Sequence, residues 1–158
     1  MQSKEELEVW YDGNDPWGYE TNPDDAYRKQ RLLSFIPGTY KRALDIGCGE
    51  GWITKDLPAD EIHGIELSDK AASRFPDNVK RVSQPEGTYD LVVCTGSLYR
   101  QYDHQQMIHW INQSASKDII IAGIKDWLVT LPWKEQKTET FPYREFEQKL
   151  THYVPLTS

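Results

Sequence analysis

The stretch Ala43–Gly51, which reads ALDIGCGEG, decides the fold of this 158-residue chain. Its first residues are apolar and typical of a strand, its glycines form a tight turn, and residues 52–57 favour a short helix that ends before Pro58. In α/β proteins, strand, glycine turn and helix in this order bring bare backbone close to a nucleotide-like ligand. A carboxylate follows at a fitting distance, because Glu66 ends the next apolar segment and can accept hydrogen bonds from ribose hydroxyls.

The glycine spacing indicates which kind of nucleotide the turn fits. A dinucleotide-binding turn has the pattern G-x-G-x-x-G, whereas the glycines here are Gly47, Gly49 and Gly51, and Trp52 stands at the third dinucleotide position. An indole at that position obstructs close packing of the helix on the strand. Asp45, at the strand end, would repel a pyrophosphate and suits a cationic ligand. The turn therefore predicts a nucleotide-like ligand that carries positive charge.

This pattern resembles motif I of the class I S-adenosylmethionine (SAM) methyltransferases, and the resemblance extends over residues 37–123. It implies a Rossmann-like, doubly wound, mainly parallel sheet, with SAM as cofactor and Glu66 as the ribose-binding acid. On this resemblance the cofactor contacts would come from Asp45, Gly47, Cys48, Gly49, Gly51, Glu66, Leu67, Gln84, Thr95, Gly96 and Leu98. Gln84 has an alternative role as an ordinary loop glutamine, and the alternative for the whole pattern is a glycine turn in another α/β protein.

The segment Asp15–Leu33, DPWGYETNPDDAYRKQRLL, adds a second resemblance. It is similar to the start of the nodulation S-type N-methyltransferases, in which a D-P-W-x-Y element precedes the first helix and closes over the cofactor. By that resemblance Trp17 and Tyr19 would cover SAM, and Arg28 or Arg31 would pair with the cofactor carboxylate. Aromatic faces near a sulfonium are also favourable through cation–π attraction. The alternative is that the two aromatic residues fasten the N-terminal segment to the core.

Length and composition narrow the class of protein. The chain has the length of one domain, and its 18 basic and 25 acidic side chains give a net charge of −7. This charge argues against a nucleic-acid or anionic-membrane partner. The N-terminus lacks the apolar core of a signal peptide, and no apolar run approaches the length of a membrane span. Cys48 and Cys94 are expected as free thiols in a cytoplasmic protein, and no spacing of Cys and His predicts a metal site.

Strand and helix patterns alternate along most of the chain, which predicts a parallel, doubly wound sheet. Asn22 and Pro23 start a helix that stops before Pro37, and another helix follows Asp103. The expected strands lie at residues 42–46, 62–67, 79–83, 88–94 and 117–124. We expect a single domain made of an N-terminal lid segment and helix (1–36), a SAM-binding core (37–124) and a substrate-side loop, helix and edge strand (125–158).

The last third of the chain predicts a sheet that is shortened at its C-terminal edge. Pro142 can start a helix with apolar positions Tyr143, Phe146 and Leu150, and one strand candidate, Thr151–Leu156, remains. That strand would lie parallel beside residues 117–124, giving six strands in the order 3-2-1-4-5-6. The alternative is a further strand from residues 127–133. The exposed edge of a six-stranded sheet is a candidate dimer surface, so monomer and homodimer both stay open.

Methyl transfer from a sulfonium needs little acid–base help, because the cofactor carries the reactive group and the protein aligns the reactants. No catalytic residue stands out. Tyr99 and His104 follow the fourth strand and are candidate bases for an acceptor proton. Their alternative roles are a cavity-wall residue for Tyr99 and an exposed residue in the first turn of a helix for His104.

The sequence therefore predicts a SAM-dependent methyltransferase that acts on a small-molecule acceptor, with an amine implied by the nodulation S-type resemblance. Two alternatives stay open: an O-methyltransferase of the same fold, and a SAM-binding protein without transferase activity.

Overall fold

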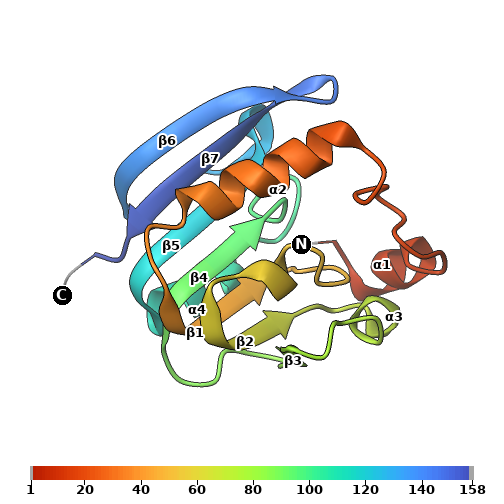
Figure 1. Ribbon diagram of the computed structural model, residues 1–158, viewed down its shortest axis with the longest axis horizontal. Coiled ribbons are helices and arrows are strands. Elements are labelled where there is room, and N and C mark those ends of the chain that lie inside the picture. The colour runs from red at the N-terminus through yellow and green to blue at the C-terminus, as the bar shows by residue number, and fades with distance from the viewer. Residues whose placement is uncertain (1, 157–158) are drawn as a thin grey trace.

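The computed structural model describes residues 2–156 of the chain. Within this range the central element is a seven-stranded sheet in the order β3-β2-β1-β4-β5-β7-β6 (Figure 1). The strands are β1 (Tyr40–Ile46), β2 (Ala59–Ile65), β3 (Val79–Arg81), β4 (Tyr89–Thr95), β5 (Ala115–Ile124), β6 (Lys134–Tyr143) and β7 (Phe146–Val154). Strands β1 to β5 pair in parallel, and β7 pairs antiparallel with both β5 and β6. The predicted Rossmann-like, mainly parallel fold is confirmed.

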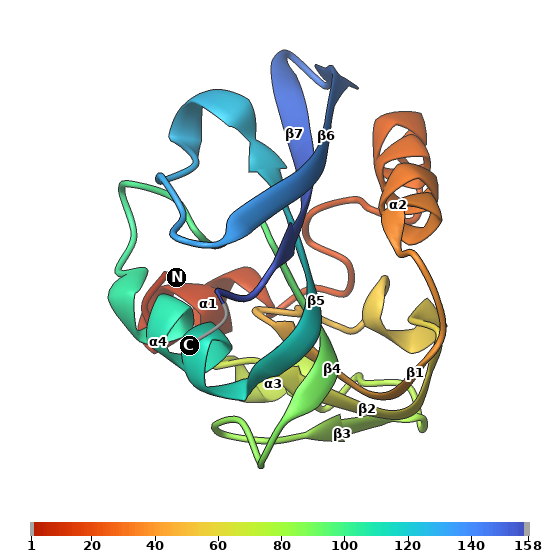
Figure 2. The same cartoon turned by 90° about the vertical axis from the view of Figure 1, so that its left-hand side faces the viewer.

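Helices cover both faces of this sheet (Figure 2). They are α1 (Lys4–Trp10), α2 (Pro23–Phe35), α3 (Asp69–Ala72) and α4 (Gln105–Ser114), with short 3₁₀ turns η1 (Thr54–Asp56) and η2 (Lys125–Trp127). Central strand β4 is buried on both sides, so its side chains alternate between two cores. Leu91 and Val93 pack with Leu32 of α2, while Val92 packs with Met107 of α4. No helix in residues 2–156 has the length and apolar character needed to cross a membrane.

Helix α2 forms where the sequence predicts it, because its start carries strong local signals. The Asn22 side chain accepts a hydrogen bond from the backbone N–H of Asp24 at 2.9 Å, and Pro23 occupies the first helical position. Helix α1 is not anticipated by the sequence analysis. It is capped by Ser3, whose hydroxyl accepts from the backbone N–H of Glu6, and Leu7 is its buried residue.

The C-terminal third differs from the prediction. The expected helix from Pro142 is wrong, since β6 and β7 form a hairpin that turns at Arg144, a non-glycine residue with φ of +53°. The spacing of Tyr143, Phe146 and Leu150 is typical of a helix, but these residues belong to two strands joined by that turn. Strand β6 escaped detection because most of its side chains are exposed on both faces and show no alternation.

The hairpin also corrects the expected edge of the sheet. Thr151–Leu156 is predicted to lie parallel to β5, but β7 is antiparallel to β5, with Thr151 opposite Ile121. The six-strand order and the shortened edge are therefore wrong, and so is the further strand from residues 127–133, which form part of η2 and a loop. A hairpin inserted after β5 fills the space that the prediction left open, and charged β6 becomes the edge.

Candidate functional site

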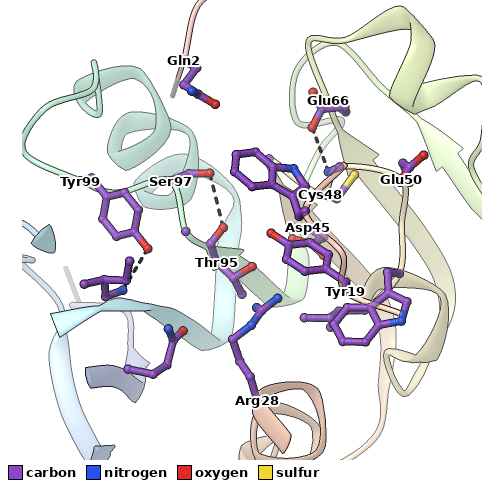
Figure 3. A pocket seen from close by; sticks show the side chains of 18 of the residues that line it. Gln2, Tyr19, Arg28, Asp45, Cys48, Glu50, Glu66, Thr95, Ser97 and Tyr99 are labelled. Carbon is purple, nitrogen blue, oxygen red and sulfur yellow. Dashed lines mark hydrogen bonds between the residues drawn. The ribbon is translucent and has the colours of Figure 1, made fainter. Parts of the chain in front are cut away.

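A cavity of about 310 Å³ lies at the carboxyl ends of the parallel strands, where open α/β sheets bind ligands (Figure 3). Its wall includes the turn after β1, the loop after β4 and the C-terminal hairpin. In Figure 3, Glu66 and Glu50 lie on one side of the cavity and Tyr99 on the other, with Arg28 between them. The cavity thus has a glycine-turn side and a far side formed by the loop after β4 and the hairpin.

The glycine turn brings bare backbone to the cavity surface. Gly47 and Gly49 have φ angles of +72° and +60°, which residues with side chains rarely adopt. A Cβ atom at Gly47 would lie 2.5 Å from Oγ of Ser97, and one at Gly49 would lie 2.9 Å from Oη of Tyr11. The backbone conformation and the close approach of Ser97 and Tyr11 therefore both require glycine at these two positions, and both glycines line the cavity.

Asp45, the penultimate residue of β1, is buried in the cavity wall with only half of its carboxylate satisfied. Oγ1 of Thr54 donates a hydrogen bond to Oδ2 at 2.7 Å, whereas buried Oδ1 has no hydrogen-bond partner in the described structure. Burial raises the pKa of Asp45 to about 7. Since buried polar atoms are nearly always paired, the lone Oδ1 suits a donor or cation supplied by a ligand.

Glu66 follows β2 and is held by two backbone groups. The N–H of Gly49 donates to Oε1 and the N–H of Ser68 donates to Oε2, each at 2.9 Å. Burial raises the pKa of this carboxyl group. Each carboxylate oxygen has further lone pairs, so Glu66 can still accept hydrogen bonds from ligand hydroxyls.

Arg28 supplies a fixed positive charge to the cavity wall. Its Nε donates to Oδ1 of Asp25 at 3.3 Å, and buried Asp25 also accepts from the hydroxyl of Tyr143 at 2.6 Å. The guanidinium lies 4.9 Å from the ring centre of Tyr19, which stacks on Trp52 at 5.3 Å. Carboxylate below and rings around it hold the guanidinium in place, so it needs little reorganisation to bind an anion.

The N-terminal segment lies against the glycine turn and is held there by polar contacts. The N–H of Asp15 donates to Oε1 of Glu50, whose other oxygen accepts from Arg74, both at 2.9 Å. The indole N–H of Trp17 donates to the hydroxyl of Tyr11 at 2.9 Å. Residues 11–19 thus form a cover on this side of the cavity.

The far side of the cavity is aromatic. Tyr99 contacts Trp127 edge-on at 5.4 Å between ring centres, and Trp127 contacts Phe146 at 5.1 Å. The hydroxyl of Tyr99 accepts a hydrogen bond from the N–H of Ile124 at 2.9 Å. Burial raises the pKa of Tyr99 to about 12, so its phenol keeps its proton at neutral pH. This geometry supports a wall role for Tyr99 more than a base role.

A family model described as a methyltransferase domain matches residues 20–158, most of the chain. The chain belongs to this methyltransferase family. The predicted enzyme class is therefore confirmed, and the match includes the hairpin residues that the sequence analysis misread. A comparison with curated protein sequences gives no significant match.

Solved structures share the fold of this methyltransferase. The N-methyltransferase NodS of Bradyrhizobium japonicum WM9, in complex with S-adenosyl-L-homocysteine (SAH), matches with a TM-score of 0.80 at 18% identity over 98% of both chains. Magnesium protoporphyrin IX methyltransferase of Synechocystis PCC 6803 with bound SAM matches with a TM-score of 0.66 at 13% identity, over 99% of this chain and 98% of that chain. The [4+2]-cyclase SpnF matches with a TM-score of 0.67 at 11% identity, over 85% of this chain and 82% of that one.

Most of the predicted site residues of this methyltransferase come together at the cavity. Its wall includes Trp17, Tyr19, Arg28, Asp45, Gly47, Cys48, Gly49, Glu66, Thr95, Gly96 and Tyr99. Arg31, the other candidate partner of the cofactor carboxylate, instead makes a two-pronged ion pair with Glu139 of β6, with both N–O distances 2.8 Å. Residues 2–156 contain no cluster of three or more His, Cys, Asp or Glu side chains arranged to hold a metal ion.

Besides Arg31, five predicted residues lie outside the cavity wall. Gly51 makes room for Pro76, whose Cδ would lie 2.9 Å from a Cβ there, and Leu98 is buried in the core beneath. Leu67 packs against the cluster that includes Leu7, and Gln84 is exposed. His104 occupies the N-cap position of helix α4 without a capping hydrogen bond from its side chain, and its Nδ1 lies 3.1 Å from the carbonyl oxygen of Tyr102.

Several residues that line the cavity are not predicted from the sequence. Tyr11 follows a helix that was not predicted, while Arg144 and Gln148 lie in the hairpin that was misread as a helix. Trp52 was identified only as an obstacle to dinucleotide binding, yet its ring stacks on Tyr19. Strand β7 shows no unbroken alternation, since Gln148 is a buried polar residue and neighbouring Leu150 and Thr151 are both buried, so no clear signal in the sequence reveals its first half.

Proposed function

We propose that this methyltransferase transfers the methyl group of SAM to a small-molecule acceptor. The observation that carries the proposal is that Asp45 and Arg28 both line the cavity that contains the glycine turn. A lone carboxylate oxygen and a fixed guanidinium suit the ammonium and carboxylate groups of an amino acid, which the methionine part of SAM carries.

The remaining cofactor contacts follow from the same wall. Glu66 accepts hydrogen bonds from the ribose, and backbone at Gly47 and Gly49 lies against the cofactor. Trp17 and Tyr19 cover it from the N-terminal side. When bound, SAM supplies an electrophilic methyl group on a sulfonium. The chain's own residues bind and orient the reactants and exclude water from the cavity.

The far side of the cavity receives the acceptor in this proposal. Tyr99 keeps its proton at neutral pH, so it orients the acceptor by contact and hydrogen bonding and does not remove a proton. His104 lies outside the wall and takes no part. A nitrogen acceptor is supported by the likeness to NodS, described as an N-methyltransferase. An O-methyltransferase is the alternative.

A SAM-binding protein without transferase activity is the third candidate. The fold likeness to SpnF, described as a [4+2]-cyclase, supports this candidate, since a cyclisation is not a methyl transfer.

We further propose one domain, with residues 1–36 as lid and first helix, 37–124 as cofactor core and 125–158 as the acceptor side. The negative net charge and free thiols of Cys48 and Cys94 support a cytoplasmic enzyme that acts on neither nucleic acid nor membrane. Monomer and homodimer are both compatible with it.

Isothermal titration with SAH, followed by a methyl-transfer assay with SAM on a panel of amines, phenols and sugars, tests the proposal. SAH binding together with methyl transfer to a panel member is the expected outcome. Absence of SAH binding contradicts it, and binding without turnover on any acceptor favours the third candidate.

A further inference from the structure

On the far side of the cavity, the Gln148 side chain has no hydrogen-bond partner among residues 2–156. Gln148 of β7 lies opposite Ile124 of β5 in the antiparallel register, and both residues line the cavity. Gln148 is only 3% exposed, yet its side-chain amide makes no hydrogen bond to any other described residue. A buried amide carries donors and an acceptor that need partners, so this one is available to a ligand.

The surroundings of Gln148 are aromatic. Tyr99, Trp127 and Phe146 form a chain of ring contacts in the same wall, and Tyr102 contacts Tyr99 at 5.9 Å between ring centres. Rings of this kind present large, flat, apolar area at low entropic cost. They favour an acceptor that has a flat face to lay against them.

Charge divides the cavity in two. Among the described residues of the wall, the carboxylates are Asp45, Glu50 and Glu66, and all three lie on the glycine-turn side (Figure 3). The hairpin contributes no carboxylate to the described wall, and its charged wall residue, Arg144, is paired with Asp25. A positively charged acceptor on the far side would lose water without gaining a carboxylate, and cation–π attraction to the rings replaces only part of the lost hydration.

We propose that the acceptor is a ring-bearing compound that carries no positive charge when bound, and that Gln148 determines specificity by hydrogen-bonding the polar group of that ring. This inference rests on the proposed methyl transfer, because it assigns the far side of the cavity to the acceptor. An aromatic ring and a sugar ring share the required chemistry of an apolar face beside a hydroxyl. An amine fits the site as its free base, the form that has a lone pair for methylation.

The test uses purified protein saturated with SAH and three probes in separate titrations: phenol, N-acetylglucosamine and benzylamine. Phenol and N-acetylglucosamine are uncharged ring compounds, whereas benzylamine is cationic at neutral pH. We expect at least one uncharged probe to bind about tenfold more tightly than benzylamine. Which of the two binds distinguishes an aromatic from a sugar acceptor. The proposal is overturned if benzylamine binds as tightly as the better of the two uncharged probes, or if neither uncharged probe binds.

Two variants isolate the role of Gln148. Gln148→Leu should weaken the favoured uncharged probe by about tenfold while SAH affinity stays unchanged. Gln148→Glu should reverse the preference, because it places a carboxylate where the wall has none. Gln136→Leu is the matched control, since Gln136 is exposed on β6 of the same hairpin.

The outcomes separate this inference from the proposed function. If the wild-type protein does not bind SAH, the result counts against the methyltransferase proposal itself. SAH binding with unchanged probe affinity in Gln148→Leu overturns only the acceptor inference. Should Gln148→Leu fail to fold, an unchanged probe preference in Gln148→Glu overturns it instead.

Discussion

At the scale of single residues, the two carboxylates Asp45 and Glu66 of one cavity differ in how their oxygens are hydrogen-bonded. Glu66 has both oxygens tied to backbone N–H groups, whereas Asp45 keeps one oxygen without a partner. Burial raises the pKa of both. Backbone groups of the protein therefore hold Glu66 in place, whereas Asp45 depends on a ligand to complete its hydrogen bonds.

We expect Glu66→Ala to weaken SAH binding by about 1.5–3 kcal/mol, roughly tenfold to a hundredfold, because charge-assisted hydrogen bonds to ligand hydroxyls are lost. Isothermal titration measures the change, and circular dichroism checks that the variant is folded. Glu86→Ala is the matched control, since Glu86 is an exposed glutamate outside the cavity wall. Equal SAH affinity in wild type and folded Glu66→Ala would remove Glu66 from the site.

Asp45 makes SAH binding depend on pH. Its pKa of about 7 in the free protein lies above the value near 4 expected of an unfolded chain, so the folded state holds a proton that the unfolded state releases. The contribution of Asp45 to the free energy of unfolding of the free protein therefore falls as pH rises from about 4 to about 7. The cationic ammonium group of SAH favours the ionised carboxylate. SAH affinity is therefore expected to rise with pH.

We expect SAH affinity to rise about tenfold between about pH 6 and about pH 8, as the ionised fraction of Asp45 increases. The neighbouring Arg28 and Glu66 act on the Asp45 pKa in opposite directions, and burial dominates both. Titration calorimetry at three pH values measures the slope. The same slope in Asp45→Asn would assign the pH dependence to another group.

At the scale of elements, the tip of the β6–β7 hairpin ties down the N-terminal cover. Arg144 donates to the carbonyl oxygen of Trp17 at 2.8 Å and to Oδ2 of Asp25 at 2.5 Å. Its backbone N–H donates to the carboxylate of Asp24 at 2.6 Å. One residue thus joins the hairpin, helix α2 and the cover, three elements far apart in sequence that meet at the cavity.

Arg144→Ala should loosen this cover without unfolding the sheet. We expect faster amide hydrogen exchange at residues 15–19 and SAH dissociation about fivefold faster, since a partly exposed ion pair and a carbonyl contact are lost. Lys80→Ala, which removes an exposed ion pair with Glu86, is the control. Unchanged exchange and dissociation in Arg144→Ala would show that the cover holds without the hairpin.

The same elements show what a sequence can predict. Strands β1, β2, β4 and β5 are buried in the centre of the sheet, so their apolar runs and the glycine turn after β1 are visible in the sequence. The short helix expected at residues 52–57 shrinks to the 3₁₀ turn η1, because Leu57 leaves the helical conformation ahead of Pro58. Local signals therefore identified the elements that place Asp45 and Glu66.

The C-terminal hairpin was not predictable in the same way. Strand β6 is an edge strand with charged side chains on both faces, which leaves no alternation to detect. Its turn depends on Arg144 in a left-handed conformation, stabilised by Asp24 and Asp25 of α2. Tertiary contacts thus decided the turn, and with it the positions of Gln148 and the far wall of the cavity.

At the scale of the whole molecule, the three proposed segments share their cores. Leu32 from α2, Ala43 from β1 and Leu150 from β7 belong to one buried cluster on one face of the sheet. Trp133, in the loop before β6, donates its indole N–H to Asn112 of α4 at 2.6 Å on the other face. No segment has a core of its own here, which predicts that the chain unfolds as one cooperative unit.

We expect thermal unfolding followed by tryptophan fluorescence and by far-ultraviolet circular dichroism to give one shared midpoint. Four of the six tryptophans, Trp10 and Trp17 in the N-terminal segment and Trp52 and Trp127 at the cavity, report on the cover and the site, whereas dichroism reports on the sheet and helices. SAH should raise both midpoints together, because a ligand that binds only the folded state stabilises everything that unfolds with its site. A fluorescence transition several degrees below the dichroism transition would show that residues 1–36 detach first, and that the cover is a separate unit from the core it closes.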